Sequence, residues 1–314
     1  MKEQYLLSYA IPTYNRPYYI AELLENSCEI FKNYNFCFLF LDASLNDDTE
    51  KIVKQYQEKY DFIYYYRDFS SFSERTLKCL ELSTAKYICI SGDTYAIKKN
   101  NIDLLINYFD LNYDIINMTN RDEKKINDKD YFNIIDMFKD CAWDMTLFGT
   151  VFIKKESFYL QHSKGINLLL DENNPFMQIY IYFNCFSGKK FKGKYINKQI
   201  SCENSVRKNN NWSKDVFHVF GEKWISIINC LDVKYNTYKK RVILDHGKYS
   251  GIFSFRKLCG YRMNNYLNLH IFFKYRKIFL SIMKVKNAIL LLLLCFVPKY
   301  ILKKIYLLEH NNEN

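Results

Sequence analysis

Three aspartates stand at or just beyond the ends of short apolar runs, and their type and spacing suit the binding of a ligand. Asp42 ends the run Phe36 to Leu41, whereas Asp68 and Asp93 follow two later runs. A carboxylate at the carboxyl end of a buried parallel strand faces the crevice in which open α/β sheets bind ligands. One such acid can equally turn the chain and cap a helix. Three that converge on one edge are hard to explain as independent caps, so we expect a site there.

The apolar runs predict the elements that bring these acids together. Strands are expected at residues 5–11, 36–41, 62–66, 87–90 and 114–118. Segments of helical spacing alternate with them, at residues 19–31, 47–60, from Ser71 onward and at 101–109. Ser71 and Glu74 have capping-box spacing. Right-handed crossovers between these strands require a mainly parallel sheet with helices on both faces. We therefore predict an α/β fold.

The rest of the chain divides into a mixed region and a helical one. A strand is expected at 150–154, a helix at 155–162, a turn at 171–175 that begins a helix, and a basic extended segment at 191–200. From about residue 212 only helical patterns occur, at 212–231, 235–246, 253–269, 271–285 and 288–308. These patterns predict an α/β domain of residues 1–205 and a basic helical extension of residues 206–314.

The ten cysteines are scattered singly, without any Cys-x-x-Cys pair. Several, such as Cys37 and Cys89, sit inside apolar runs, as small buried hydrophobic residues do, and not as zinc ligands or a disulfide framework. This usage is typical of a reducing compartment. Lys2 and Glu3 precede only a short apolar run without a small-residue cleavage site, so we expect no signal peptide.

Basic charge is concentrated in the C-terminal third. Residues 234–308 contain 16 Lys and Arg against one acid, Asp245, in a chain of net charge +11. An anionic partner should therefore meet this region. The apolar run Ala288 to Val297, which Pro298 ends, is about half of the ~20 residues that cross a bilayer.

This basic tail has three interpretations. An interfacial helix on anionic lipid suits its lysines best, which are Lys284, Lys286, Lys299, Lys303 and Lys304. The alternative is an ordinary buried helix against the first domain. Nucleic acid is not expected as a partner, because no recognition motif occurs and the apolar content is high.

Four short motifs, in order and at the right spacing, carry a resemblance to a known family. They are Pro12-Thr13-Tyr14-Asn15-Arg16, then Asp42 with Asp47 and Thr49, then Arg75, and then Ser91-Gly92-Asp93-Thr94-Tyr95. Together they resemble the family 2 glycosyltransferases with the GT-A fold, over about residues 4–200. The helical tail is loosely similar to that of bacterial capsule, O-antigen and lipooligosaccharide transferases.

The resemblance implies roles for the donor-binding residues. Pro12, Tyr14 and Asn15 would lie along the nucleotide base, and Asp42 would accept from the uracil imide or a ribose hydroxyl, as a charge-assisted bond suits. Arg75 would reach the base or the diphosphate, although it can also be read as a solvated helix arginine. Gly92 and Asp93 would complete the donor site, and Asp68 is a weaker candidate.

The resemblance also implies a divalent metal, but the motif departs from the family's pattern. The family's second carboxylate, which holds Mg²⁺ or Mn²⁺ against the diphosphate, is replaced because Thr94 and Tyr95 follow Asp93. A single aspartate supplies few of the oxygen ligands that a hard divalent cation requires. Asp93 would then contact ribose or support a metal weakly, and the leaving diphosphate could be neutralised by Lys98 or by a side chain from 189–194.

Inverting transfer requires a general base near the acceptor hydroxyl. By the family's pattern this base is Asp171 or Glu172, shortly before Pro175, with Asp144 as the second choice. These acids could also be plain helix-start residues near the positive end of a helix dipole. The acceptor sugar is expected over Phe148, Gly149 and Thr150, where glycine permits close backbone approach.

The resemblance therefore implies an inverting transferase that moves a sugar, with UDP as the expected donor nucleotide, to a cell-surface glycan or lipid-linked oligosaccharide. It would act in the cytoplasm, peripherally at the inner face of a bacterial membrane. Two alternatives remain. A sugar nucleotidyltransferase would show a glycine-rich loop where this chain has Pro-Thr-Tyr-Asn-Arg. A catalytically inactive partner in polysaccharide assembly would bind donor or membrane without turnover. The sequence leaves the sugar, the linkage and the oligomeric state open.

Overall fold

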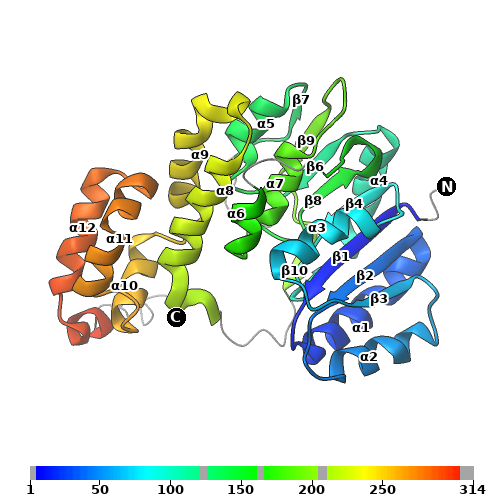
Figure 1. Ribbon diagram of the computed structural model, residues 1–314, viewed down its shortest axis with the longest axis horizontal. Helices are drawn as coiled ribbons and strands as arrows, with labels where there is room; N and C mark the ends of the chain where they lie inside the picture. Colours follow the sequence, from blue (N-terminus) through cyan, green and yellow to red (C-terminus); the bar gives the residue numbers. More distant parts are fainter. Residues whose placement is uncertain (1–4, 120–125, 161–165, 204–210, 305–314) are drawn as a thin grey trace. The chain divides into compact units, whose positions relative to one another are not determined.

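The computed structural model describes residues 5–119, 126–160, 166–203 and 211–304. The chain forms two compact units (Figure 1). The first unit comprises residues 1–208 and 230–235, and the second comprises residues 209–229 and 236–314. Residues 230–235 are anchored in the first unit by Tyr235, whose hydroxyl donates to the Phe183 carbonyl at 2.7 Å.

An eight-stranded sheet forms the centre of the first unit. Its strands, in order across the sheet, are β3 (Ile63–Arg67), β2 (Phe36–Asp42), β1 (Leu7–Thr13), β4 (Tyr87–Ile90), β8 (Val151–Lys154), β6 (Ile115–Met118), β9 (Gly193–Ile196) and β7 (Lys129–Tyr131). The first four strands pair in parallel, while β8 runs antiparallel to both β4 and β6. A separate ribbon pairs β5 (Tyr95–Ile97) with β10 (Ser201–Glu203).

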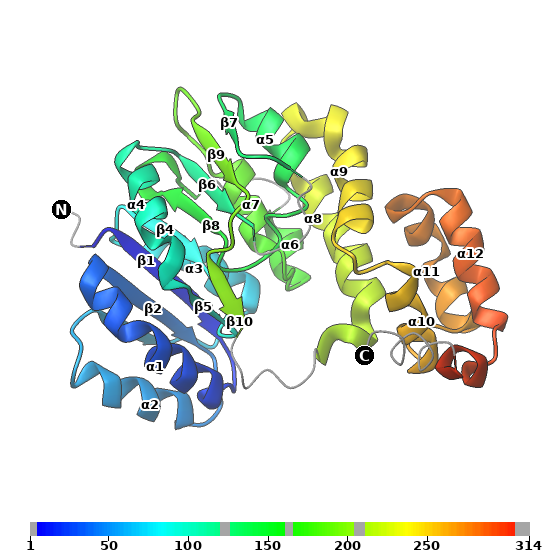
Figure 2. The same cartoon turned by 180° about the vertical axis from the view of Figure 1, so that it is seen from behind.

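Helices cover both faces of this sheet. One layer contains α1 (Pro17–Tyr34), α2 (Asp48–Gln57) and α4 (Ile102–Asp110), as Figure 2 shows. The other contains α3 (Phe72–Leu82), α6 (Ile166–Asp171) and α7 (Met177–Asn184), in front in Figure 1. A short helix, α5 (Ile134–Cys141), lies near β7 and β9. The first layer is held by a ring stack in which Phe31 of α1 lies 4.0 Å from Phe38 of β2, centroid to centroid. The predicted α/β sheet is thus confirmed.

Two local predictions in this unit need correction. The first strand does not stop before Pro12 but continues to Thr13, because proline is tolerated near a strand end where its missing N–H is not needed. The strand predicted at 150–154 is confirmed as β8, which inserts antiparallel between β4 and β6. The helix expected at 155–162 is only a 3₁₀ turn at Lys155–Ser157, after which Phe158 bridges to Phe186; residues 161–162 lie outside the described ranges.

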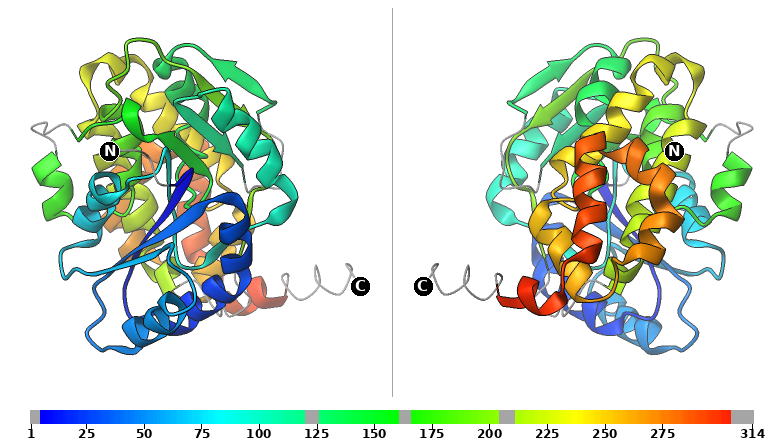
Figure 3. Two further views of the ribbon diagram at one scale, coloured as in Figure 1. Left: turned by 90° about the vertical axis from the view of Figure 1, so that its right-hand side faces the viewer. Right: turned by 90° about the vertical axis from the view of Figure 1, so that its left-hand side faces the viewer.

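The second unit is helical. Its elements are 3₁₀ and π turns at Asn211–Asp215 and His218–Lys223, followed by α8 (Trp224–Cys230), α9 (Asn236–Tyr249), α10 (Phe255–Met263), α11 (Leu269–Ile282) and α12 (Val285–Phe296). Figure 3 shows α11 (orange) beside α12 (orange to red). The last helix predicted from sequence, at 288–308, is interrupted: α12 ends at Phe296, before Pro298, and helical residues resume at 299–304, the last residues that the structure describes.

One face of α12 is apolar and exposed. Val285, Ile289, Leu293 and Phe296 are each between 55% and 64% exposed, and at about 100° per residue they fall on one side of the helix. We call these four residues the apolar stripe. Lys284 and Lys286 are also exposed at the start of this helix. Among the described residues, no helix combines the length and the apolar character that crossing a bilayer requires.

Candidate functional site

Asp42 and Asp93 lie at the same edge of the sheet, on either side of β1. Strand β1 runs between β2 and β4, and Thr13 is the register partner of Asp42. The chain leaving β4 continues this arrangement, because Ser91 N–H donates to the Ala10 carbonyl at 2.8 Å. We call this edge, at the carboxyl ends of β2, β1 and β4, the rim. The topology therefore brings two of the predicted acids together, with Thr13 between them.

Asp42 is fully buried and organises the loop that follows it. One carboxylate oxygen accepts from the backbone N–H of Ser44 at 2.8 Å and from the Ser44 hydroxyl, and the other accepts from the Tyr65 hydroxyl at 2.8 Å. Burial and the bond to Asp42 raise the pKa of Tyr65. Asp42 and Ser44 each expose 0% of their surface, whereas Tyr65 is half-buried, so the carboxylate itself does not border solvent in this conformation.

The loop after β1 is joined to the loop after β2 through Asn15 and Ser44. The Asn15 N–H donates to the Ser44 hydroxyl at 2.8 Å, and the Asn15 side-chain oxygen accepts from the Leu45 N–H at 3.2 Å. Asn15 has a left-handed φ of 52°, which asparagine tolerates better than most residues. Tyr14, the preceding residue, is 48% exposed. Its ring is therefore presented to solvent on a loop that Asp42 and Ser44 hold in place.

Asp93 is 4% exposed and has a partner on each carboxylate oxygen. The Thr13 hydroxyl donates to one oxygen at 2.8 Å, and Arg16 donates to the other at 2.8 Å. Burial raises the pKa of Asp93, although Arg16 and Thr13 both act in the opposite direction. Arg16 immediately precedes α1, and its side chain is 44% exposed. The pair thus places a cation at the rim, outside a buried carboxylate.

The donor set around Asp93 does not fit a metal held by protein carboxylates. Its two oxygens already accept from Thr13 and Arg16. Across the described ranges, no group of three or more His, Cys, Asp or Glu side chains is positioned to hold a metal ion. Mg²⁺ and Mn²⁺ take oxygen ligands, carboxylates above all. A cation at this rim would need most of its ligands from a substrate, and a metal bound there would compete with Arg16.

Arg75 is a buried cation near the rim with unused hydrogen-bonding capacity. It is 5% exposed, and one terminal nitrogen donates to the Ser70 carbonyl. Its Nε has no partner, and it makes no ion pair with any carboxylate that the structure describes. Burial lowers the pKa of Arg75, while Asp68 and Asp42 act to raise it. Arg75 is therefore not a solvated helix arginine, and its spare N–H groups suit an anion.

Two other basic candidates, Lys98 and Lys194, have partners elsewhere in the chain, and Asp68 is paired as well. Lys98 donates to the Gln199 side chain at 2.7 Å. Lys194, at the amino end of β9 and so away from the rim, donates to Asp130 at 3.2 Å. Asp68 accepts from Lys78 at 2.6 Å and from the Ser70 N–H at 2.9 Å. Burial acts to raise the pKa of Asp68, but the bonds from Lys78 and Ser70 outweigh it, so the pKa is lowered.

Phe148 and Gly149 lie against the chain that leaves β4. Gly149 has a φ of +76°, and a Cβ there would meet the hydroxyl oxygens of Ser91 and Tyr9 at 2.8 Å, so only glycine fits without a shift. The position of a Cβ on Gly92 is 3.8 Å from the Phe148 Cβ. Thr150, by contrast, is fully buried and donates to the carbonyl of Leu147 at 2.9 Å.

Phe148 also connects this loop to the start of α3 and to the predicted base. Its ring packs edge-on against Phe72, with 6.0 Å between centroids. The next residue, Ser73, binds the turn after α6: its N–H donates to the Asn173 side chain at 3.2 Å and its hydroxyl to the Asn174 carbonyl at 3.0 Å. Asp171, the exposed last residue of α6, and Glu172, which is half-buried in the turn that follows, therefore lie close to the aromatic pair in the chain that Ser73 binds.

Asp144 lies apart from this turn and is fully buried. Its carboxylate accepts from the Asn117 amide and from the Thr119 hydroxyl, both at 3.3 Å, at the carboxyl end of β6. A buried, hydrogen-bonded carboxylate of this kind fixes the end of a strand. Because Asp144 has no exposed surface, the geometry favours Asp171 and Glu172 over it as the acid that meets an acceptor.

Sequence reasoning missed four side chains that shape the rim. They are Thr13, Arg16, Ser44 and Tyr65. Thr13 and Arg16 stand inside the motif quoted above, but a motif does not say which residue each side chain contacts. Ser44 follows Asp42 at the spacing of an Asx turn, which was a usable signal. Tyr65 could not have been found, because its contact with Asp42 arises only when β3 pairs with β2.

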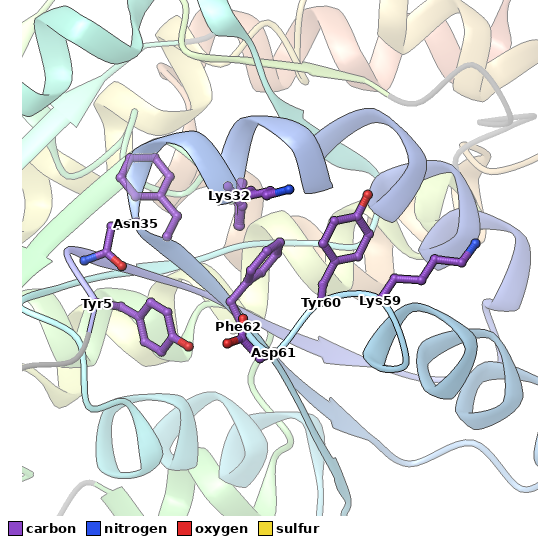
Figure 4. A pocket seen from close by; sticks show the side chains of 9 residues that line it. Tyr5, Lys32, Asn35, Lys59, Tyr60, Asp61 and Phe62 are labelled. Atoms are coloured by element: carbon purple, nitrogen blue, oxygen red, sulfur yellow. The ribbon is translucent and has the colours of Figure 1, made fainter.

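A separate cavity of about 330 Å³ lies at the opposite edge of the sheet (Figure 4). Lys32, Asn35, Lys59, Tyr60 and Phe62 are among the residues that line it. These residues precede or begin the strands, whereas the rim is formed by the strand ends. None of the predicted site residues lines this cavity, so it is distinct from the candidate site.

The first unit matches a known protein family. The family model described as glycosyl transferase family 2 matches residues 8–177, more than half of the chain. A curated relative, the abequosyltransferase RfbV of Salmonella typhimurium, is 32% identical over 115 residues, which cover 35% of this chain and 34% of that protein. The match thus spans about a third of that relative's length.

Solved structures resemble the chain over a longer range. The crystal structure of TarS from S. aureus has a TM-score of 0.50 and 13% identity, covering 90% of this chain and 54% of that one. The chain therefore spans about half the length of TarS. The mannosyltransferase PcManGT from Pyrobaculum calidifontis, solved with GDP-Man and Mn²⁺, has a TM-score of 0.47 and 13% identity, covering 77% and 71%. At this identity the likeness to TarS shows the fold alone. It agrees with the predicted GT-A architecture.

Proposed function

Because the chain belongs to glycosyl transferase family 2 and is a glycosyltransferase, we propose that it transfers a sugar from a nucleotide-diphosphate donor, a UDP-sugar, to a hydroxyl of a cell-surface glycan or lipid-linked oligosaccharide. The observation that carries this proposal is the rim, where Thr13 pairs in register with Asp42 and donates a hydrogen bond to Asp93. The curated relative is named an abequosyltransferase, which supports transfer of a sugar here.

The rim offers what a nucleotide requires. In the proposal, the base lies against the exposed ring of Tyr14, on the loop that Asn15 and Ser44 hold. Asp42 acts by fixing Ser44 and Tyr65, and it accepts directly from the base or ribose once the loop admits the ligand. A charge-assisted bond of this kind is about twice as strong as a neutral one. Pro12 is buried behind this loop and shapes it.

Charge on the leaving diphosphate would be neutralised by arginine. The spare N–H groups of Arg75 and the solvent-facing guanidinium of Arg16 are the cations that support this role. A planar guanidinium matches phosphate oxygens in pairs, so it can stabilise the negative charge that develops as the diphosphate departs. Because the residues around Asp93 do not fit a metal held by protein carboxylates, the proposal assigns this charge neutralisation to the two arginines.

The acceptor sugar would rest on Phe148 and Phe72, next to Gly92. Asp171 or Glu172 then removes the proton from the acceptor hydroxyl. That oxygen attacks the anomeric carbon from the side opposite the leaving group. The bond from the anomeric carbon to the diphosphate breaks, and the electron pair leaves with the nucleoside diphosphate. The product is a glycoside of inverted configuration and a protonated base.

Membrane attachment is part of the proposal and rests on the second unit. The apolar stripe of α12 is exposed, and Lys284 and Lys286 stand at its start. An amphipathic helix of this type lies in the headgroup region, where each lysine contributes about 1 kcal/mol on anionic lipid. The proposed location is the cytoplasmic face of a bacterial membrane, where a lipid-linked acceptor would be available.

The proposal is tested by offering the full chain a panel of nucleotide sugars and measuring free nucleoside diphosphate. We expect slow hydrolysis of one UDP-sugar without acceptor and faster release when a matching glycan is added. Release from no member of the panel, together with no thermal shift by UDP, would contradict a donor site at the rim. Binding of UDP without turnover of any donor would instead favour the inactive-partner alternative.

A further inference from the structure

The second unit contains a cavity of about 570 Å³ between its helices. This volume lies within the range of about 300–1,000 Å³ that small-molecule sites occupy. Its apolar lining comes from α9, α10, α11 and α12 and the segments between them; it includes Leu244, Phe253, Leu258, Ile282, Met283 and Leu290. The cavity is therefore suited to a hydrocarbon chain.

Cations border this apolar interior. Arg241, Lys248, Lys284 and Lys286 line the cavity together with one acid, Asp245. Arg241 is paired with Asp245 at 3.3 Å, and Lys248 donates to the Tyr249 hydroxyl at 2.5 Å. Lys284 and Lys286 make no ion pair with any residue that the structure describes. Two lysines are thus left to balance an anion from outside the chain.

One wall of the cavity is fixed by a close backbone contact. A Cβ on Gly247 of α9 would lie 2.3 Å from the Ile282 carbonyl oxygen at the end of α11. Only glycine lets these two helices approach so closely. Ser254 caps α10 by accepting from the Lys257 N–H at 3.4 Å. The space between these helices is therefore set by their packing.

The cavity and the apolar stripe occupy neighbouring sides of α12. At about 100° per residue, Lys286 and Leu290, which line the cavity, fall next to Val285, Ile289 and Leu293 of the stripe. A lipid lying along the stripe could therefore place one chain in the cavity without leaving the bilayer surface. This continuity, together with the two lysines that make no ion pair, favours an occupant with an apolar chain and an anionic headgroup.

We propose that this cavity binds one acyl chain of an anionic membrane phospholipid, with the phosphate held by Lys284 and Lys286. The inference rests on the membrane attachment proposed above and makes it selective for anionic lipid. A bilayer phospholipid is favoured over a lipid-linked acceptor because the stripe supplies continuity with the bilayer. Bound lipid would fix the second unit on the membrane through a specific site in addition to general adsorption.

The test uses the full chain and soluble dioctanoyl-phosphatidylglycerol below its micelle concentration, with binding measured by calorimetry. We expect saturable binding that K284Q/K286Q weakens at least tenfold. K303Q/K304Q removes the same charge from exposed lysines outside the cavity, and it should change the affinity less than twofold. Leu258→Trp, which fills the interior, should abolish binding while circular dichroism confirms that the variant is folded.

Other outcomes would overturn the inference. An equal loss of lipid affinity in the two double variants would mean that the lipid is attracted by overall charge and not by a specific site. Equal affinity for the phosphatidylcholine analogue would mean that the cavity does not select an anionic headgroup. Tighter binding of farnesyl phosphate than of phosphatidylglycerol would assign the cavity to a polyprenyl acceptor. Sedimentation with phosphatidylglycerol vesicles separates the two proposals: vesicle binding without binding of the soluble lipid removes the cavity but keeps membrane attachment, and absence of both removes both.

Discussion

The hydroxyl of Thr13 donates a 2.8 Å hydrogen bond to the carboxylate of Asp93. Thr13 is also the register partner of Asp42 on the neighbouring strand. One residue at the end of β1 therefore ties the loop after β4 to the edge that carries Asp42. A change at any of these three positions should disturb the binding of a nucleotide across the rim before it disturbs the stability of the sheet.

Asp42→Ala should raise the donor KM by about 10- to 100-fold, because bonds to a charged group contribute roughly 1.5–3 kcal/mol. The variant leaves the Ser44 and Tyr65 hydroxyls without their acceptor. Titration calorimetry with UDP measures the effect. Asp48→Ala, which removes an exposed acid from α2, is the control. Unchanged UDP affinity in Asp42→Ala would remove Asp42 from the site.

Thr13→Val keeps the shape of Thr13 but removes its hydroxyl. Of the two side chains that donate to Asp93, Thr13 and Arg16, only Arg16 then remains. The variant loses a buried hydrogen bond worth about 1 kcal/mol. We expect the donor KM to rise about five- to tenfold while kcat changes little. Steady-state kinetics on the best donor measures this split. A loss confined to kcat would argue against the coupling of the rim through Thr13.

Asp93 should set the acid limb of the pH profile. Burial raises the pKa of Asp93, so its carboxylate takes up a proton at a higher pH than an ordinary aspartate, whose pKa is about 3.9. The protonated form no longer pairs with the charge of Arg16. The fall of kcat/KM on acidification should therefore begin above that ordinary range, and Asp93→Asn should lose this limb together with most activity.

Protonation of Asp93 should also affect how the free energy of unfolding depends on pH. A raised pKa in the folded state means that folding favours the neutral form of Asp93. The stability that this protonated carboxyl contributes is therefore present at low pH and is lost as the pH rises through the raised pKa. Asp93→Asn stays neutral throughout. Its free energy of unfolding, relative to that of the wild type, should therefore increase as the pH rises over this interval. Parallel curves for the two proteins, measured by denaturant titration, would contradict the assigned pKa direction.

Removal of divalent metal should leave measurable transfer, because Arg16 and Arg75 carry the positive charge that supports the leaving diphosphate. In EDTA we expect at least a tenth of the rate seen with Mn²⁺. Arg75→Gln should lower kcat/KM about 100-fold, since it removes a buried cation with spare donors. Lys54→Gln, an exposed residue of α2, is the control. Complete and reversible loss of transfer in EDTA would show that a metal is required.

The general base should be revealed by kcat. Replacing the true base by its amide should lower kcat by 10²- to 10⁴-fold without raising the donor KM, so Asp171→Asn and Glu172→Gln are compared directly. Asp144→Asn should act on stability instead, because Asp144 is buried with Asn117 and Thr119. If neither variant of the turn lowers kcat tenfold, the base lies elsewhere in the chain.

Much of the first unit could be predicted because its signals are local. The run before Asp42 is apolar and short, and it forms β2 at Phe36–Asp42. The capping box predicted from Ser71 and Glu74 is confirmed, with bonds of 3.2 and 2.7 Å between them. Such features depend on the spacing of side chains along the chain, which determines which face of an element is buried and where a helix begins.

What the sequence by itself determined is the alternation of strands and helices, and therefore the edge to which Asp42 and Asp93 are carried. Only the tertiary structure decided that β8 enters antiparallel between β4 and β6, that Tyr65 and Thr13 bind the two acids, and that Asp144 is sealed inside. The physical reason is that these contacts join residues far apart in the chain. Their energies depend on strand order and packing, which no local spacing encodes.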